Sequence, residues 1–270
     1  MRLNLFVLVA IVMFFAHPAT AAPDSIKHIG KGLSLHKEMY GMPGTWADKY
    51  HDEETEIVFQ LSVKQQIFKT NFFLAYTQKS LWQAYNTKES SPFRETNYNP
   101  EVFYRFPSGH FSSWGLGDSH LINDLGADLG FEHESNGQSV PESRSWNRFY
   151  FTPCYSNGNL VLQLKLSYRV PESDKEYFGD TDGDDNPDIT DYSGYSELHL
   201  YQQFYHDHLV HLMVRGNGAT KKGAIELTYS LPGFDGNTFY MIKAFHGYGD
   251  SLIDYNNSIS RIGIGIMLSR

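Results

Sequence analysis

Residues 160–170 read LVLQLKLSYRV, and in this stretch apolar and mostly polar side chains alternate from one position to the next. Successive side chains of a β-strand face opposite sides, so the stretch predicts a strand with one apolar and one mainly polar face. The same period of two recurs at 207–215, 224–231 and 261–268, and we find no long amphipathic helix. We therefore expect an all-β fold.

The alternation and the turn residues between segments predict twelve strands. They are expected at 33–46, 55–67, 70–85, 98–107, 122–135, 144–156, 158–171, 190–205, 207–217, 221–231, 236–248 and 258–269. Twelve strands of about ten residues are typical of an antiparallel transmembrane β-barrel, in which the strand number is usually even. A secreted, water-soluble barrel or sandwich with its apolar face turned inward is the alternative.

The composition of the strand faces favours the membrane form. Charged and amide side chains on the polar faces suit the interior of a small barrel; they are Gln163, Lys165, Arg169, Arg215 and Glu226. Aromatic residues gather near strand ends, as they do in the interfacial girdles of membrane barrels. The chain departs from the pattern at its end, Met267–Arg270, which lacks the terminal aromatic residue common on outer-membrane barrels.

Overall composition excludes several other classes of protein. The 270 residues have a mean hydropathy of −0.42 and are 15% aromatic, which fits neither a bundle of membrane helices nor a disordered chain. A single cysteine, Cys154, excludes a disulfide framework and a cysteine-based zinc site. The net charge of −9 argues against a nucleic-acid partner, which would need a basic face.

The first residues resemble a targeting segment. Arg2 precedes a mainly apolar run from Leu3 to Ala16, and Ala19–Ala21 offers small residues of the kind that signal peptidase cleaves after. We expect residues 1–21 to be a signal peptide and 22–270 to form one barrel domain. An uncleaved membrane anchor is the alternative.

Candidate catalytic residues lie between His133 and Asn147. His133 and Ser135 are separated by one residue in an extended segment, so their side chains should emerge on one face. If the following hairpin is symmetric about Val140, His133 lies opposite Asn147, within side-chain reach. An imidazole can activate a serine nucleophile, and an amide carbonyl can fix the tautomer of that imidazole. A polar pair at a strand end without catalytic function is the alternative, as we expect for the similarly spaced His110 and Ser112.

Two motifs of this region carry a family resemblance. The sequence HESNG at His133–Gly137, followed by SRSWNR at Ser143–Arg148, closely resembles the catalytic hairpin of bacterial outer-membrane phospholipase A. Further similar segments occur in the same order on both sides, at Tyr76–Ser80, Ser90–Tyr98, Asp184–Thr190 and Gly247–Asn256. The resemblance thus extends from about residue 55 to the end of the chain.

The resemblance implies a 12-stranded barrel in the bacterial outer membrane that hydrolyses acyl esters of membrane phospholipids and is activated as a homodimer. Ser135 would be the nucleophile, His133 the base and Asn147 the orienting amide. It also implies a calcium ion beside these residues, with the backbone carbonyl of Gln138, the hydroxyl of Ser143 and Ser90 of the partner subunit as ligands. Calcium accepts such neutral oxygen ligands.

The chain departs from the family pattern at one position near this site. Val140 stands where the family often has an acidic residue, which puts a second, monomer-state calcium site in doubt. Asp185 matches another acidic position associated with that second site. It lies in the acidic run Asp180–Asp188, which could alternatively be a separate calcium loop or a solvated strand connection.

Two other functions remain open at this point. One is a non-catalytic outer-membrane barrel, such as a narrow porin or an adhesin. The other is a soluble secreted esterase with an inward-facing apolar core.

Overall fold

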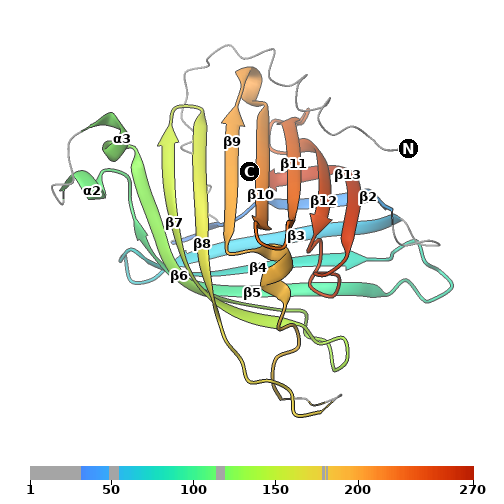
Figure 1. Ribbon diagram of the computed structural model, residues 1–270. Helices are drawn as coiled ribbons and strands as arrows, with labels where there is room; N and C mark the ends of the chain where they lie inside the picture. Colours follow the sequence, from blue (N-terminus) through green and yellow to red (C-terminus); the bar gives the residue numbers. More distant parts are fainter. Residues whose placement is uncertain (1–31, 49–54, 114–118, 178–179, 181) are drawn as a thin grey trace.

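The computed structural model describes residues 32–48, 55–113, 119–177, 180 and 182–270 as one curved sheet with short helices (Figure 1). The signal peptide predicted at residues 1–21 lies outside the described residues. In chain order the strands are β1 (Leu33–Leu35), β2 (Met39–Ala47), β3 (Thr55–Gln66), β4 (Phe72–Trp82), β5 (Phe93–Phe106), β6 (Leu125–Ser135), β7 (Ser145–Asn157), β8 (Leu160–Val170), β9 (Ser196–Gln203), β10 (Leu209–Asn217), β11 (Lys222–Pro232), β12 (Phe239–Tyr248) and β13 (Ser258–Ser269).

The sheet closes on itself through antiparallel pairs. From β2 onward each strand pairs with its chain neighbour, and β13 pairs with β2. Leu35 of β1 pairs with Val63, and Tyr40 of β2 pairs with Gln60 on the same strand β3. β1 and β2 are therefore one strand interrupted at residues 36–38, and the wall is a closed twelve-stranded antiparallel barrel. The predicted fold class is confirmed.

The interruption at residues 36–38 turns three polar side chains into the lumen. His36 Nε2 lies 2.7 Å from Glu101, and Lys37 donates to Asn99 Oδ1 at 2.8 Å. Glu38 is buried and contacts His211 and Lys243. These contacts tie the β1–β2 strand to β5, β10 and β12 across the interior.

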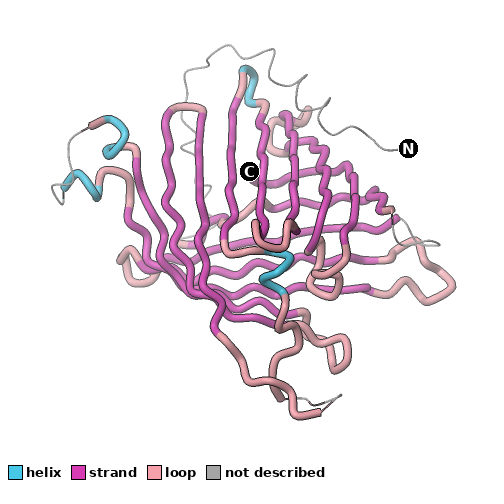
Figure 2. The backbone as a smooth tube through the Cα atoms, in the orientation of Figure 1, coloured by secondary structure: helices cyan, strands magenta, loops and turns pink. Residues whose placement is uncertain are grey.

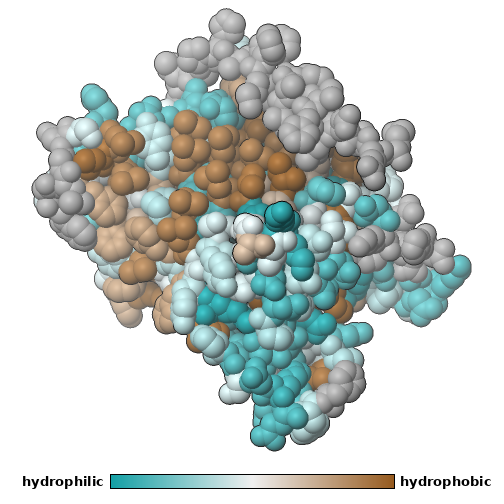
Figure 3. Space-filling view, in the orientation of Figure 1, coloured by the Kyte–Doolittle hydropathy of each residue, from teal (hydrophilic) through white to brown (hydrophobic). Residues whose placement is uncertain are grey.

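The outer face of the wall is apolar. Side chains at alternate positions of β6 to β9 are exposed and apolar; they are Leu129, Phe149, Phe151, Leu164, Leu166, Tyr168 and Leu198. In the view of Figure 3, apolar residues cover much of the upper part of this face. Each Å² of apolar surface left in water costs about 25 cal/mol of free energy. A continuous apolar belt is therefore expected to contact lipid chains and not water. The alternation thus has the membrane orientation, although one buried apolar cluster also packs on the inner side of the wall; it consists of Tyr40, Met42, Val58, Leu81, Met241 and Met267.

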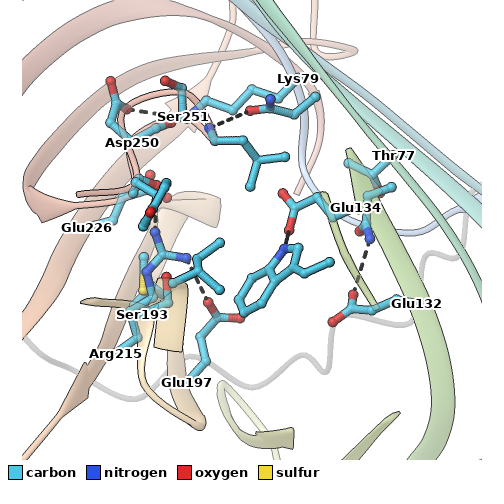
Figure 4. Close-up of a pocket in the computed structure, with 18 of the residues that line it drawn as sticks. Thr77, Lys79, Glu132, Glu134, Ser193, Glu197, Arg215, Glu226, Asp250 and Ser251 are labelled. Carbon is cyan, nitrogen blue, oxygen red and sulfur yellow. Dashed lines mark hydrogen bonds and ion pairs between the residues drawn. The ribbon is translucent and has the colours of Figure 1, made fainter. Parts of the chain in front are cut away.

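The lumen is filled with paired charges. Lys165 and Arg148 contact the buried carboxylate of Glu132 at 2.6 and 2.9 Å, and Arg215 lies 3.5 Å from Glu197 (Figure 4). Charges taken out of water require such partners. A polar cavity of about 200 Å³ remains between them. The polar faces therefore fill the barrel interior.

Several predicted strand limits are wrong, and the two largest errors are at the starts of β5 and β9; the strand predicted from 122, for example, begins at Leu125, after helix α3 (His120–Asn123). β5 begins at Phe93 rather than at 98, because Arg94 forms a bulge between pairs Leu81–Glu95 and Trp82–Phe93, and its charge is paired with Glu56. The segment predicted as a strand from 190 begins as helix α4 (Ile189–Ser193), and β9 starts only at Ser196.

The helices are short and lie in connections between strands. They are α2 (His110–Ser113), α3 (His120–Asn123), α4 and the 3₁₀ turn η2 (Tyr205–Asp207). In α4, Ile189 packs with Trp146, Leu252 and Tyr255, so that this apolar cluster covers one end of the lumen. No helix within the described ranges has both the length and the apolar character needed to cross a membrane.

Four connections between consecutive strands lie together at one end of the barrel. Because successive strands run in opposite directions, the segments 83–92, 136–144, 171–195 and 249–257 share this end, whereas α2 and α3 lie in a connection at the opposite end (Figure 2). β6 ends and β7 begins at this end. The candidate catalytic residues therefore lie at the rim of the barrel.

The carboxylate of Glu56 tests how far the lumen charges stabilise the fold. Glu56 is fully buried, with Arg94 at 2.6 Å and Arg261 at 2.9 Å. Removing one partner of a buried charge cluster leaves the others uncompensated, so Glu56→Ala should lower the free energy of unfolding by about 3 kcal/mol. Urea unfolding in detergent micelles measures this loss. Glu89→Ala, at an exposed carboxylate in segment 83–92, is the matched control, and an equal effect of both changes would contradict the account.

Candidate active site

Alternation along β6 places His133 and Ser135 on the outer face. Their neighbours Glu132 and Glu134 point into the lumen, where both contact Arg148. The intervening odd-numbered positions therefore face outward, in line with Leu129. His133 and Ser135 thus share the outer face at the strand end nearest the rim.

The β6–β7 register brings Asn147 to the histidine. His133 pairs with Asn147 directly across the hairpin, as the symmetry about Val140 predicted, and Ser135 pairs with Ser145. The Asn147 Oδ1 atom lies 3.0 Å from His133 Nδ1. An amide oxygen can only accept, so Nδ1 carries the proton and Nε2 presents its lone pair. Among the described residues no hydrogen bond joins Ser135 to the ring.

Segment 136–144, which joins the two strands, is organised by Asn136. The buried Asn136 side chain accepts from the backbone N–H groups of Gln138 and Arg144 at 3.2 and 3.0 Å, and it donates to the Glu142 carbonyl at 2.8 Å. Gly137 has a φ of +65°, and a Cβ there would lie 3.0 Å from the Tyr98 ring. A residue with a side chain would be strained at this position.

The predicted metal ligands are only partly brought together. The Ser143 hydroxyl donates to the Asp185 carboxylate, and Lys175 forms an ion pair with the other oxygen of Asp185. Gln138 lies in the same segment 136–144 as Ser143. Ser90 is exposed in segment 83–92, and no contact between described residues joins it to the other three.

The connection from β8 to α4 is fastened to the hairpin by residues that the sequence analysis did not single out. Asn186 is fully buried and accepts from the backbone N–H of Ser145 at 3.0 Å. Arg169 donates to Asp184 at 2.6 Å, and Glu172 accepts from the Asn147 amide at 3.1 Å. Asn186 belongs to a segment already singled out for its resemblance, whereas nothing in the sequence around Glu172 indicates this contact.

Two ionisable side chains of segment 249–257, Tyr255 and Asp250, contact residues of neighbouring segments at this end of the barrel. Burial and then the hydrogen bond to Asp188, at 2.5 Å, raise the pKa of the Tyr255 phenol, which therefore remains a donor. Burial alone would raise the pKa of Asp250, but the charges of Lys79 and Arg261 outweigh it and hold that pKa below its usual value. Asp250 is thus ionised beside the mouth of the lumen (Figure 4).

A second cluster of possible metal ligands, Glu38, His211 and Glu226, lies inside the barrel. The Lys243 ammonium already contacts Glu226 at 2.8 Å and Glu38 at 3.1 Å, and His211 Nδ1 lies 2.7 Å from Glu38. This cluster is therefore a lumen charge network with its own internal cation. It is separated from His133 by the wall of the barrel.

The outward location determines which substrates can reach the candidate triad. The side chains of Phe149 and Phe151 follow Asn147 on the same face of β7, and both are exposed. The hydrocarbon chains of a long-chain substrate would contact this apolar belt, while its polar group, at the membrane surface, would lie at the level of the triad. The arrangement suits attack by an activated serine on a carbonyl carbon at that depth.

Comparisons with known proteins identify the family to which the chain is similar. The family model described as Phospholipase A1 matches residues 32–268. The chain is 40% identical over 233 residues to phospholipase A1 of Escherichia coli K12, covering 83% of this chain and 72% of that protein. It is 38% identical over 224 residues to a putative phospholipase A1 of Neisseria meningitidis, covering 82% of this chain but only 55% of that protein.

Two solved structures share the fold. Outer-membrane phospholipase A from Escherichia coli matches with a TM-score of 0.75 and 32% identity, covering 88% of this chain and 98% of that one. The Salmonella typhi outer-membrane phospholipase, a dimer with bound calcium, matches with a TM-score of 0.77 and 32% identity, covering 92% and 99%.

Asn136 gives a direct test of how the hairpin segment is held. Asn136→Ala removes both acceptor contacts to the Gln138 and Arg144 amides. Amide hydrogen exchange at these two positions should then accelerate roughly tenfold or more, as expected when hydrogen bonds that close a local structure are lost. Ser139→Ala, at an exposed position of the same segment, should leave both rates unchanged. Unchanged protection in Asn136→Ala would mean that other contacts hold the segment.

Proposed function

Because the chain belongs to the phospholipase A1 family and forms an outer-membrane β-barrel, we propose that it hydrolyses acyl esters of membrane glycerophospholipids with Ser135, His133 and Asn147 as its triad. The hydrogen bond between His133 and Asn147 on the outer face carries the proposal. This hydrogen bond occupies Nδ1 of His133 and leaves Nε2 available on the outer face, where Ser135 also lies. No comparable arrangement of these three residue types faces the lumen among the lining residues of the cavity.

The proposed reaction proceeds through an acyl-serine intermediate. The Ser135 oxygen attacks the ester carbonyl carbon while His133 Nε2 takes the hydroxyl proton. As the tetrahedral intermediate collapses, the ester C–O bond breaks and the lysophospholipid oxygen receives that proton from His133. Water then gives a proton to His133 and attacks the acyl carbon; the bond to the Ser135 oxygen breaks, that oxygen regains the proton from His133, and the fatty acid leaves. Asn147 holds the imidazole in the tautomer that both steps require.

The oxygen donors beside the triad fit the calcium ion that the family implies. Ser143 and Asp185 are in direct contact, and Lys175 shows that this carboxylate already attracts a cation. We propose that Ser143 and the Gln138 carbonyl hold Ca²⁺ beside the triad. We further propose that Asp185, which the resemblance associates with a second site, adds its carboxylate here because it contacts Ser143. Calcium accepts hydroxyl, carboxylate and carbonyl oxygens. When bound, the ion would supply positive charge for the oxyanion that develops on the ester carbonyl.

The exposed position of Ser90 supports a role across a dimer. No contact between described residues joins Ser90 to Ser143 or Asp185 within one chain, but its segment 83–92 is at the same end of the barrel. We propose that Ser90 of the partner subunit completes the calcium site, so that the active form is a homodimer. The Salmonella typhi relative, a calcium-bound dimer, is the structural precedent.

The nucleophile is tested by Ser135→Ala. Removal of the nucleophile of a serine triad typically lowers kcat by a factor of 10⁴ or more, so phospholipid hydrolysis in detergent with calcium should fall to about background. Heat-modified mobility on gels should show that the barrel remains folded. Ser139→Ala, four positions along the chain and exposed, should retain full activity. Activity in a folded Ser135→Ala variant would end the triad assignment, and an inactive wild-type chain would favour a non-catalytic barrel.

The calcium site is tested by two substitutions with opposite expected effects. Asp185→Asn removes a ligand charge and should weaken calcium binding roughly tenfold. Lys175→Gln removes a competing cation that is only partly exposed, so calcium should bind roughly three- to tenfold more tightly. Isothermal titration calorimetry of the detergent-solubilised protein measures both changes.

Lys221→Gln controls for loss of a lysine charge at the same end of the barrel, because its side chain is exposed. If Lys175→Gln bound calcium no better than this control, the ion would occupy a site away from Asp185.

A further inference from the structure

Glu172 contacts the triad amide from the side opposite to the histidine. It follows β8 by two residues, and Val170, the last residue of β8, pairs with Asn147. The Asn147 Nδ2 atom donates to Glu172 Oε1 at 3.1 Å, while Asn147 Oδ1 faces His133 Nδ1 at 3.0 Å. The amide is therefore held at both ends.

These two contacts differ in chemical character. A side-chain amide has a carbonyl and an NH₂ end of similar size, and turning it over exchanges an acceptor for a donor. An ionised carboxylate can only accept hydrogen bonds, so Glu172 is compatible with the NH₂ end of Asn147 and not with its carbonyl. The carboxylate therefore fixes which end of Asn147 faces His133.

The orientation of the amide determines the state of the imidazole. If the NH₂ end of Asn147 faced His133, the Nδ1 atom would have to accept, and in the neutral ring the proton would move to Nε2. Nε2 could then no longer take the proton of a serine. In serine proteases, holding the wrong imidazole tautomer lowers the rate greatly although the geometry is kept.

The position of Glu172 is fixed by the rest of its connection. The next residue, Ser173, accepts from the Asp184 backbone N–H at 2.8 Å. Gly183 has a φ of +94°, and a Cβ there would lie 2.8 Å from the Ser173 carbonyl oxygen, so the two parts of the connection meet backbone to backbone. Asp184 is in turn anchored by Arg169 on β8. The residue that follows Glu172 is thus tied back to β8 through Asp184 and Arg169, which restricts where the Glu172 side chain can lie.

We propose that Glu172 is a positioning residue of the active site, which holds the Asn147 amide so that its carbonyl faces His133 and Nε2 remains the base. The inference rests on the proposed phospholipase function. Glu172 acts through Asn147 and is not expected to touch the substrate, so its loss should lower kcat and leave KM unchanged.

Steady-state kinetics on Glu172 variants test this role. Glu172→Ala should lower kcat roughly tenfold, about what one hydrogen bond to a charged group contributes, with KM unchanged. Glu172→Gln can present an NH₂ as well as a carbonyl to Asn147, so it should fix the amide less strictly and recover kcat only in part. Asp174→Ala, at an exposed carboxylate two residues along the same connection, should behave as wild type. Equal activity of Glu172→Ala and Asp174→Ala, or full wild-type kcat in Glu172→Gln, would overturn the proposal.

A double-mutant cycle with Asn147→Ala separates positioning from a general effect on folding. If Glu172 acts through Asn147, adding Glu172→Ala to Asn147→Ala should cause no further loss of kcat. An additional tenfold loss in the double variant would show that Glu172 acts by another route and would overturn the proposal.

The tautomer of His133 can be measured without turnover. The ¹⁵N chemical shifts of the His133 imidazole should show the proton on Nδ1 in the wild type and a mixture of tautomers in Glu172→Ala. This measurement distinguishes the two hypotheses: an inactive wild type would overturn the phospholipase function, whereas identical tautomers in the two proteins would overturn the role of Glu172.

Discussion

The anchoring of β6 to the lumen is the interaction on which the proposed site depends. Glu132 and Glu134 point inward and meet Arg148, and Glu132 also meets Lys165. A shift of the register by one residue would turn these carboxylates toward lipid, which is far more costly than any loss in the hairpin. The buried charges therefore fix the outward direction of His133 and Ser135. The polar interior both stabilises the barrel and determines which face carries the chemistry.

The connections at the rim then determine the positions of the side chains around the candidate triad, which the strands of the wall do not fix by themselves. Asn136 shapes the segment between β6 and β7, and Asn186 fastens the β8–α4 connection to the start of β7. The same connection carries Asp185 beside Ser143. A loop that would be solvated in a bare barrel thus becomes part of the proposed site. Ser143 and the amide of Asn147 are both contacted by the connection between β8 and α4, through Asp185 and Glu172.

The sequence predicts the barrel well because every strand needs apolar side chains toward lipid and mainly polar side chains toward the lumen, which produces an alternating pattern. The period of two locates all twelve wall strands, and the hairpin symmetry about Val140 gives the His133–Asn147 pair. The errors fall where tertiary contacts override the local pattern. The predicted strand began only at 98, but Arg94 lies inside β5 because its charge is paired with Glu56 on β3. The strand predicted from 190 begins instead as helix α4, whose Ile189 packs on Trp146.

The contacts of Glu172 and Lys175 lay beyond sequence reasoning for a different reason. Both residues belong to an irregular connection whose path follows no periodic rule, and each meets a partner on another segment. Asn147 and Asp185 were singled out as site residues, but nothing in their spacing indicates which charge would face them. The catalytic roles of the triad rest on the family resemblance and on the geometry of the hairpin together.

Location of the covalent adduct formed with a long-chain sulfonyl fluoride tests the central claim most directly. The account predicts a single calcium-dependent adduct, which peptide mass spectrometry places on Ser135, at the outward rim above the apolar belt. An adduct on a lumen-facing residue or on Ser112, or an active enzyme that forms no adduct on Ser135, would contradict it.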